Sequence, residues 1–316
     1  MGKNAKIYIA GHRGLVGSAI LRTLEAEQYT NIVTRTRDEL DLLDQVAVAE
    51  FFATEKPEYI FLAAAKVGGI TANSTYPADF IYENLQIQNN IIHNAHAHKV
   101  TKLLFLGSSC IYPKMAPQPL KEEYLLTGPL EESNKAYAIA KIAGLMMCTK
   151  YKSQYGDNFI SAMPTNLYGT GDNFHPKNSH AIPQIMRKLH EAKLANLPQV
   201  GGFTDGTPLR EFLHVDDLGR ACLFLMHNYT DTQTINVGTG EDLSMGEVIH
   251  LIAKVVDYTG EILLDGTIPN GTPRKVLDVS RIHELGWQHS IALEEGLRDM
   301  YEWFCNQTQT DVRGYQ

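Results

Sequence analysis

The chain has 316 residues, 44% of them hydrophobic, and a formal net charge of −8 at pH 7. This length and composition support a substantial core, whereas the acidic balance argues against a nucleic-acid or membrane surface, which would carry basic clusters. No apolar run approaches the roughly 20 residues of a membrane span, the first residues show no signal-peptide pattern, and the four cysteines are widely separated, so we expect a cytoplasmic protein with free thiols.

Apolar runs and helical periodicity alternate along the first half of the chain. This alternation predicts βαβ units and therefore an α/β fold, a Rossmann-type doubly wound parallel sheet with helices on both faces. Ligands in such sheets bind beyond the carboxyl ends of the strands. We expect strands at 6–10, 31–35, 58–64, 102–106, 159–164 and 234–238, and helices at 15–28, 44–55, 78–98 and 136–155.

After about residue 165 glycine and proline become frequent, which predicts shorter elements and more turns. We expect a smaller α/β domain here that covers the ligand edge of the sheet. Residues 1–168 and 213–241 are assigned to the Rossmann domain, and residues 169–212 and 242–316 to the second domain. The helices expected in this part of the chain lie at 180–196, 216–229, 244–257 and 292–305.

A glycine-rich loop, GHRGLVG, follows the first strand and opens the first helix. Gly11, Gly14 and Gly17 would permit a tight turn and a close approach of the backbone to a pyrophosphate at the helix N-terminus, where Leu15 and Val16 lie. An incidental turn is the alternative. The position between a strand and a helix favours a dinucleotide site.

The second strand ends in TRTR at 34–37. Chains that bind NAD usually end this strand with an acid, which accepts a hydrogen bond from the ribose 2′-hydroxyl. Arginines instead suit a 2′-phosphate, through charge-assisted pairing. Exposed arginines at a strand end are also common. We predict NADP (NADPH) as the cofactor, with Arg37 and Arg13 near its 2′-phosphate.

Tyr137 and Lys141 are four residues apart in a helical stretch, so both side chains lie on one face. A neighbouring ammonium favours the phenolate, and we expect it to lower the pKa of Tyr137. The pair would then exchange a proton with a carbonyl or alcohol near neutral pH. Ser108 ends the strand at 102–106, where its hydroxyl can hydrogen-bond to the same oxygen. Together the three residues resemble the catalytic set of the short-chain dehydrogenase/reductase superfamily, in its extended, sugar-nucleotide branch.

Cys110 follows Ser108 by two residues in GSSCIYPK. On an extended exit from the strand both side chains would point to the same side. Reduction of a ketone needs no thiol. Cys110 is therefore either an acid/base group or a small buried hydrophobic residue, and spacing alone does not decide between them.

A closer resemblance runs over nearly the whole chain. IAGHRGLVGSAI, RTRDELDL, AAAKVGGITAN, KLLFLGSSCIYPK, YAIAKIAG, MPTNLYG, DNFHPKNSH, REFLHVDDL and NGTPRK resemble the GDP-L-fucose synthase family. The resemblance implies one site that converts GDP-4-keto-6-deoxy-D-mannose to GDP-L-fucose, by 3,5-epimerisation and then NADPH-dependent reduction at C4. It also implies that Ser108, Tyr137 and Lys141 serve the reduction and stabilise an enolate, and that Cys110 and His180 are the acid/base pair of the epimerisation.

The same resemblance implies which residues contact the cofactor and the substrate. At two positions the sequence departs from the pattern of the family. Phe203 stands where Trp is usual and Asn270 where Asp is usual; these changes bear on substrate affinity rather than on the reaction type. Asn270 also lies in a turn signature, PNGTP. The implied cofactor contacts are Lys141, His180 and, beside the nicotinamide, Pro164, Thr165, Asn166 and Leu167. The implied substrate contacts are Ser109, Asn134, Phe203, Asn270, Lys275 and, at the diphosphate, Lys188 and Arg210.

Other functions remain open on this fold. Another epimerase, reductase or dehydratase of the extended family is the nearest alternative, although a 4,6-dehydratase or 4-epimerase would retain NAD and prefer an acid at the end of the second strand. A non-catalytic NADP sensor would typically have lost Tyr137 or Lys141.

The helices at 78–98 and 136–155 predict a homodimer through a four-helix bundle, by analogy with relatives. Histidines cluster at 93, 96 and 98, but no fourth ligand has a zinc-like spacing, so we predict no metal site.

Overall fold

The computed structural model describes residues 1–176, 179–267 and 271–307. At its centre lies a six-stranded sheet with the strand order β10–β5–β4–β3–β1–β2, in which every neighbouring pair is parallel. Most of these strands are buried along their whole length because both faces are covered, which explains their continuous apolar runs. The strands are β1 (Ile7–Ala10), β2 (Ile32–Thr34), β3 (Tyr59–Leu62), β4 (Lys102–Leu106), β5 (Phe159–Pro164) and β10 (Ile235–Val237).

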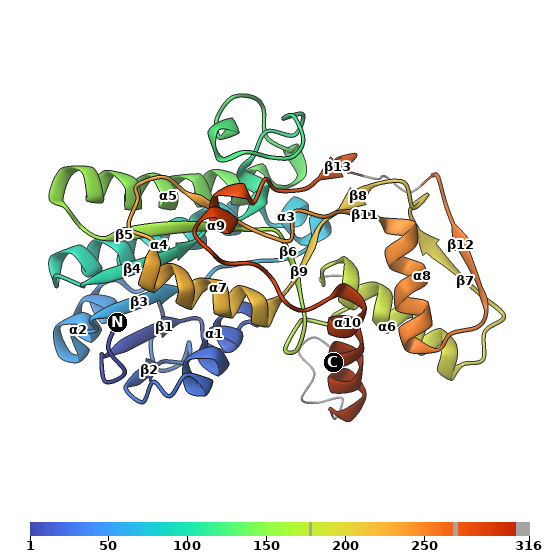
Figure 1. Ribbon diagram of the computed structural model, residues 1–316, viewed down its shortest axis with the longest axis horizontal. Coiled ribbons are helices and arrows are strands. Elements are labelled where there is room, and N and C mark those ends of the chain that lie inside the picture. Colours follow the sequence, from blue (N-terminus) through green and yellow to red (C-terminus); the bar gives the residue numbers. More distant parts are fainter. Residues whose placement is uncertain (177–178, 268–270, 308–316) are drawn as a thin grey trace.

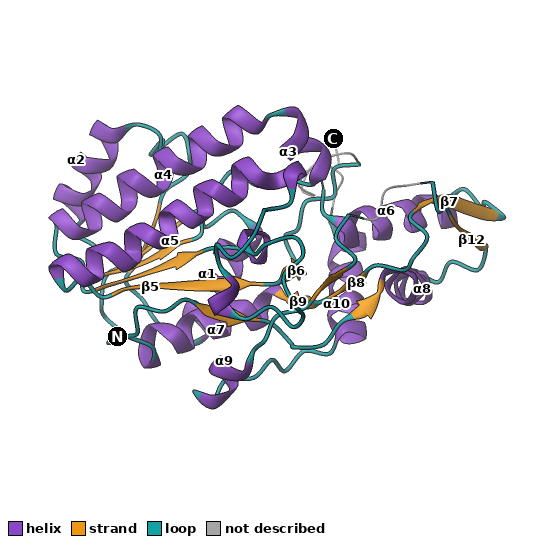
Figure 2. Ribbon diagram, turned by 90° about the horizontal axis from the view of Figure 1, so that it is seen from above, coloured by secondary structure: helices purple, strands orange, loops and turns teal. Residues whose placement is uncertain are grey.

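Helices cover the two faces of the sheet (Figures 1 and 2). On one face α4 (Pro77–Ala97) packs along α5 (Lys135–Tyr155), with α2 (Gln45–Glu55) beside α4. On the other face α1 (Leu15–Ala26) packs along α7 (Val215–Asn228). The chain reverses direction across the sheet at β1, since β2 lies on one side of it and β3 on the other. Loops that leave β1 and β3 therefore diverge at the carboxyl edge, where such sheets bind their ligands.

One buried lysine fixes the end of α7 to the sheet. Lys102, at the start of β4, donates to three backbone carbonyls at this helix end, those of Leu225, Met226 and Tyr229, over 2.6–3.0 Å. The carbonyl of Leu225 also accepts from the N–H of Tyr229 at 3.1 Å. The ammonium adds a donor at this helix end, where carbonyls lack partners from a following turn, and opposes the negative end of the helix dipole.

A second group of elements packs at the carboxyl edge of the sheet, on the right of Figure 1. It has its own apolar core, in which Met186, Leu189, Ile252 and Leu297 are fully buried. Its helices are α6 (Ala181–Leu194), α8 (Met245–Val256) and α10 (Leu293–Asn306). Its strand pairs are β7 (Gln199–Phe203) with β12 (Glu261–Leu264), β8 (Leu209–Arg210) with both β11 (Leu243–Ser244) and β13 (Arg274–Lys275), and β6 (Asn166–Tyr168) with β9 (Phe212–His214).

The Rossmann-type α/β fold expected from the sequence is confirmed, and each strand and helix expected by its residue range is present with its ends shifted by a few residues. The boundaries between the two domains stay a prediction. The second region has its own core, but Leu277, Ile282 and Trp287, which the prediction assigns to the second domain, pack in the core of the central sheet. The elements that the sequence analysis missed are short: α3 (Ile70–Thr75), α9 (Ser280–Glu284), the small strands of the second region, and the single 3₁₀ turns η1 (Ser109–Ile111), η2 (Glu122–Tyr124) and η3 (Glu132–Asn134). None of the helices described is both long and apolar enough to cross a membrane.

Candidate active site

The glycine loop forms a cradle that only glycine permits. Gly11 has a φ of +88°, and a Cβ there would lie 2.7 Å from the backbone nitrogen of Ala64. A Cβ on Gly17 would lie 2.1 Å from the carbonyl oxygen of Gly11. Gly14 is the N-cap of α1, which has no side-chain cap and no acidic residue in its first turn. By contrast, α8 begins with a capping box. The N–H groups at the start of α1, where Leu15 and Val16 are half-buried, therefore suit a pyrophosphate.

A pocket of about 270 Å³ joins the glycine loop to the end of β2. The three arginines that line it differ in their contacts. Arg35 is tied to the carboxylate of Glu55 and donates to the carbonyl of Thr34 at 2.8 Å. Arg13 and Arg37 are exposed and form no ion pair with any described carboxylate. Two cations are thus available for a 2′-phosphate, and the donor set fits NADP.

The residues expected beside the nicotinamide follow the end of β5. Pro164 and Thr165 are buried, and Asn166 and Leu167 are partly buried. Asn166 donates from Nδ2 to the carbonyl of Glu211 at 2.7 Å. These residues lie at the carboxyl edge of the sheet, as expected for a cofactor contact, but their individual roles stay predictions.

Ser108, Tyr137 and Cys110 meet where β4 ends. Ser108 Oγ accepts a hydrogen bond from the backbone N–H of Cys110 at 3.3 Å and so caps η1. The expectation of an extended exit is therefore wrong, because this cap turns the chain into a 3₁₀ turn directly after Ser108. The Tyr137 phenol on α5 lies close to both Ser108 and Cys110. Lys141, one turn further along α5, is buried and donates to the carbonyl of Leu106 at 2.8 Å.

The expected lowering of the Tyr137 pKa is wrong, because its pKa is raised. Burial raises the pKa of Tyr137, the nearby Cys110 raises it further, and the neighbouring Ser108 hydroxyl opposes both. Lys141 Nζ lies 5.8 Å from the centre of the Tyr137 ring. Burial also lowers the pKa of Lys141, to about 8, which weakens the positive charge that the sequence argument relied on.

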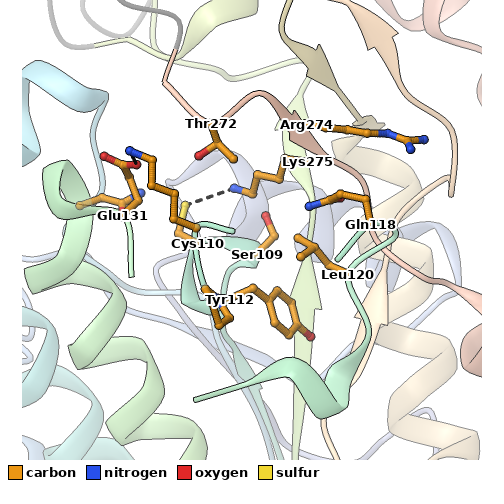
Figure 3. A pocket seen from close by; sticks show the side chains of 12 residues that line it. Ser109, Cys110, Tyr112, Gln118, Leu120, Glu131, Thr272, Arg274 and Lys275 are labelled. Carbon is orange, nitrogen blue, oxygen red and sulfur yellow. Dashed lines mark hydrogen bonds and ion pairs between the residues drawn. The ribbon is translucent and has the colours of Figure 1, made fainter. Parts of the chain in front are cut away.

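A second pocket opens at Cys110 (Figure 3). Lys275 of β13 points into it and places Nζ 3.4 Å from Cys110 Sγ. Arg210 lies opposite Lys275 in the β8–β13 register. Asn134 also lines the pocket, and its Oδ1 is buried without a hydrogen-bond partner. Among the predicted residues, Ser109, Cys110, Asn134 and Lys275 thus share one pocket.

Several residues predicted to bind the substrate or to act in catalysis do not line this pocket. Lys188 on α6 places Nζ 4.8 Å from the centre of the Phe203 ring and donates to the carbonyls of Gly201 and Gly202 at 3.1 and 2.9 Å. His180 is exposed at the N-cap of α6. Its pairing with Cys110 stays a prediction. Asn270 lies outside the residues that the structure describes.

Sequence reasoning missed several residues of the site. Lys114, Gln118 and Glu131 line the Cys110 pocket, and Lys114 pairs with Glu131 at 2.7 Å. Glu211 is fully buried behind it. Its carboxylate accepts from three backbone N–H groups over 2.6–2.9 Å, those of Thr239, Gly240 and Leu277. An acidic residue between Arg210 and Phe212, where two short strands meet, was the available signal for Glu211; the other three had none.

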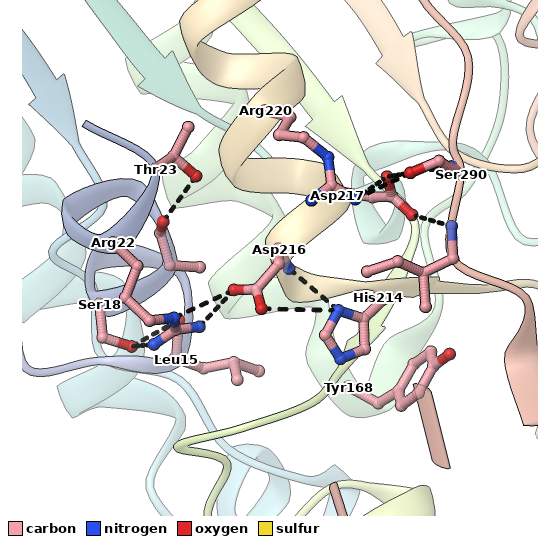
Figure 4. A network of polar contacts seen from close by, with 12 residues as sticks. Leu15, Ser18, Arg22, Thr23, Tyr168, His214, Asp216, Asp217, Arg220 and Ser290 are labelled. Atoms are coloured by element: carbon pink, nitrogen blue, oxygen red, sulfur yellow. Dashed lines mark hydrogen bonds and ion pairs between the residues drawn. The ribbon is translucent and has the colours of Figure 1, made fainter. Parts of the chain in front are cut away.

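A polar network connects α1, the helix that follows the glycine loop, to the second region (Figure 4). Arg22 of α1 pairs with Asp216 at the start of α7. The next residue, Asp217, is buried and accepts from the backbone N–H groups of Ser290 and Ile291 at 3.1 and 2.9 Å. Ser290 and Ile291 lead into α10. The network therefore links α1 and α7, which cover the central sheet, to a helix of the second region.

The fold and its sheet-edge pockets define a nucleotide-dependent enzyme of the Rossmann type. The sequence model of the NAD dependent epimerase/dehydratase family matches residues 7–238. The chain is 58% identical over 302 residues to Putative GDP-L-fucose synthase 2 of Arabidopsis thaliana (96% of this chain, 92% of the relative). It is 56% identical over 318 residues to GDP-L-fucose synthase of Escherichia coli (98% and 99%). Among solved structures, a GDP-mannoheptose C4 reductase from Campylobacter jejuni with NADP bound is 43% identical, with a TM-score of 0.89 (97% and 100%).

The chain belongs to the NAD dependent epimerase/dehydratase family and, within it, to the GDP-L-fucose synthases.

Proposed function

We propose that this protein converts GDP-4-keto-6-deoxy-D-mannose to GDP-L-fucose, by epimerisation at C3 and C5 followed by NADPH-dependent reduction at C4. The observation that carries the proposal is the meeting of Tyr137, Ser108 and Cys110 at the end of one strand. Reduction of a ketone uses the first two, and exchange of the protons beside the ketone uses the third. The identity to GDP-L-fucose synthases supports this reaction.

In the reduction, Tyr137 donates a proton to the C4 oxygen while Ser108 donates a hydrogen bond to it. The glycine loop, with Arg13 and Arg37, would hold NADPH, which would supply a hydride for C4. Lys141, as a buried ammonium, stabilises the negative charge left on the phenolate. The similar GDP-mannoheptose C4 reductase, whose structure contains NADP, supports this choice of cofactor.

The epimerisation uses the same hydrogen bonds to the C4 oxygen. C3 and C5 flank the ketone, so loss of a proton from either carbon gives an enolate whose charge lies on that oxygen, beside Ser108 and Tyr137. Inversion needs one group to remove a proton and another, on the opposite face, to return one. Cys110 and His180 are assigned to this pair, since a thiol and an imidazole both exchange protons near neutral pH.

The GDP moiety binds toward the second region. Lys188 and Arg210 are assigned to the diphosphate, Phe203 to an apolar wall, and Ser109, Asn134 and Lys275 to the sugar. Burial lowers the pKa of Lys188, which a bound diphosphate would offset.

The protein is further assigned as a cytoplasmic homodimer. Its interface would be a four-helix bundle of α4 and α5, on which Tyr82 and Ile139 are exposed. Free cysteines support the location.

The second candidate is reduction at C4 without epimerisation, which the likeness to the GDP-mannoheptose C4 reductase favours. Incubation with GDP-4-keto-6-deoxy-D-mannose and NADPH, followed by NMR of the product, separates the two. We expect GDP-L-fucose. An unepimerised GDP-6-deoxy-D-hexose as the only product would contradict the proposal and support the second candidate.

A further inference from the structure

The ammonium group of Lys275 faces the Cys110 thiol and is not neutralised. Its Nζ lies 3.4 Å from Cys110 Sγ (Figure 3), and no described carboxylate forms an ion pair with it. The neighbouring cation, Arg274, points away from Cys110 and is bound to Asp242, with Nε 2.6 Å from Oδ2. Adjacent residues of one strand thus have opposite surroundings, as expected where side chains alternate between its faces.

The position of Lys275 is fixed by the fold. Glu211 donates its backbone N–H to the carbonyl of Lys275 at 3.3 Å, and its buried carboxylate accepts from the N–H of Leu277 at 2.9 Å. Glu211 therefore holds this segment twice, through its backbone N–H at Lys275 and through its buried carboxylate at Leu277. The ammonium is held at the thiol rather than reaching it by chance from a mobile loop.

Cations outnumber anions around the thiol. Arg210, opposite Lys275 in the register, also acts electrostatically on Cys110. The other charged groups that line the pocket are Lys114 and Glu131, which pair with each other, and Arg274, which Asp242 neutralises. On the side of α5 the thiol meets Tyr137, which burial keeps neutral.

We propose that Lys275 is a positioning residue of the epimerisation, which holds Cys110 as a thiolate ready to accept a proton from the sugar. In that step a lone pair of Sγ forms the S–H bond, the C–H bond breaks, and its electron pair passes to the C4 carbonyl oxygen. Negative charge moves from the sulfur beside Lys275 to the oxygen beside Ser108 and Tyr137, with no change in oxidation state. The catalytic part of this inference rests on the proposed function.

The direction of the Cys110 pKa agrees with this geometry. Burial raises the pKa of the thiol, but the charge of Lys275, the hydrogen bonds with Ser108 and Lys275, and the charge of Arg210 together lower it below its ordinary value. Cys148 and Cys222, which lack a cation, show the contrast: burial raises the pKa of Cys148 to about 12, and that of Cys222 also rises.

The contact can be tested without substrate, by following iodoacetamide alkylation of each cysteine in the full-length protein across pH, with peptide mass spectrometry as the readout. Exposed Cys305 is the internal reference. We expect the alkylation midpoint of Cys110 to lie below that of Cys305. Lys275→Met should raise the Cys110 midpoint by about one pH unit or more, the effect of removing an opposite charge at this range. Lys275→Arg should largely restore it, and Arg274→Met, the matched control, should leave it in place.

An unchanged midpoint in Lys275→Met, or an equal shift in Arg274→Met, would overturn the proposal; melting temperatures confirm that each variant is folded. Deuterium exchange into GDP-4-keto-6-deoxy-D-mannose gives the catalytic readout. Lys275→Met should slow the exchange about tenfold at pH 7, for a pKa shift of one unit, and a higher pH should recover it. If the wild type shows no exchange although the midpoint shifts as expected, the epimerase function is wrong and the thiolate contact stands.

Discussion

Replacing Arg37 with Met should weaken the binding of NADPH and leave that of NADH nearly unchanged. Arg37 is exposed in the pocket at the end of β2 and is held by no described carboxylate. Arg35 lies two residues earlier but is tied to Glu55. The two arginines are therefore a matched pair, with similar side chains and places in the chain and with different availability to a 2′-phosphate.

The size of the effect follows from the exposure of Arg37. A hydrogen bond between charged groups contributes about 1.5–3 kcal/mol, and solvent around an exposed guanidinium reduces this to about 1–2 kcal/mol. The Kd for NADPH should therefore rise roughly 5- to 30-fold. Added salt should weaken NADPH binding to the wild type more than to Arg37→Met, since screening acts on the exposed ion pair that the variant lacks.

The assay is titration of each variant with NADPH and NADH at low and high salt, followed by cofactor fluorescence. Arg35→Met is the control and should change the preference for NADPH little. The reasoning is refuted if Arg35→Met costs more NADPH affinity than Arg37→Met, or if Arg37→Met weakens NADH as much as NADPH.

Three further results are expected. Glu211→Gln should lower the free energy of unfolding by about 2–4 kcal/mol, because a neutral amide replaces a buried carboxylate that accepts from three backbone N–H groups; an unchanged urea midpoint would contradict this. Lys102→Met should cost about 2–4 kcal/mol in the same assay, since three carbonyls at the end of α7 lose their ammonium donor, and a stabilised variant would show that burial of the ammonium dominates. Because burial lowers the pKa of Lys141 to about 8 and the ammonium is the active form, kcat/KM for the reduction should fall as pH rises through about 8. Lys141→Arg should remove that alkaline limb, and a limb at the same pH in the variant would assign it to another group.

Much of the fold could be predicted because its signals are local. Six apolar runs and the helices between them can be read from the residues of each segment alone, and the central sheet then follows from their alternation. The glycine loop could also be recognised from the sequence, since close contacts at Gly11 and Gly17 exclude any residue with a Cβ. TRTR at the end of the second strand indicated the phosphate-binding cations, although it did not reveal that Glu55 holds Arg35.

The rest depended on contacts between distant residues. Lys275 reaches Cys110 only because a two-residue strand, too short for any pattern, pairs with β8. Lys114, Gln118 and Glu131 lie in irregular chain, so no periodicity marks them as part of a pocket. The exit after β4 was misjudged because Ser108 caps a turn. Burial, which spacing does not report, reversed the expected shift in the pKa of Tyr137.

Deuterium exchange tests the central claim most directly. The protein is incubated in D₂O with GDP-4-keto-6-deoxy-D-mannose and no NADPH, and proton NMR follows the sugar. Loss of the C3 and C5 signals in the wild type, slowed strongly in Cys110→Ser, is the predicted result. Persistence of both signals, with the same protein still oxidising NADPH in the presence of a keto-sugar, would contradict epimerisation at this site and leave Cys110 a packing residue beside a reductase.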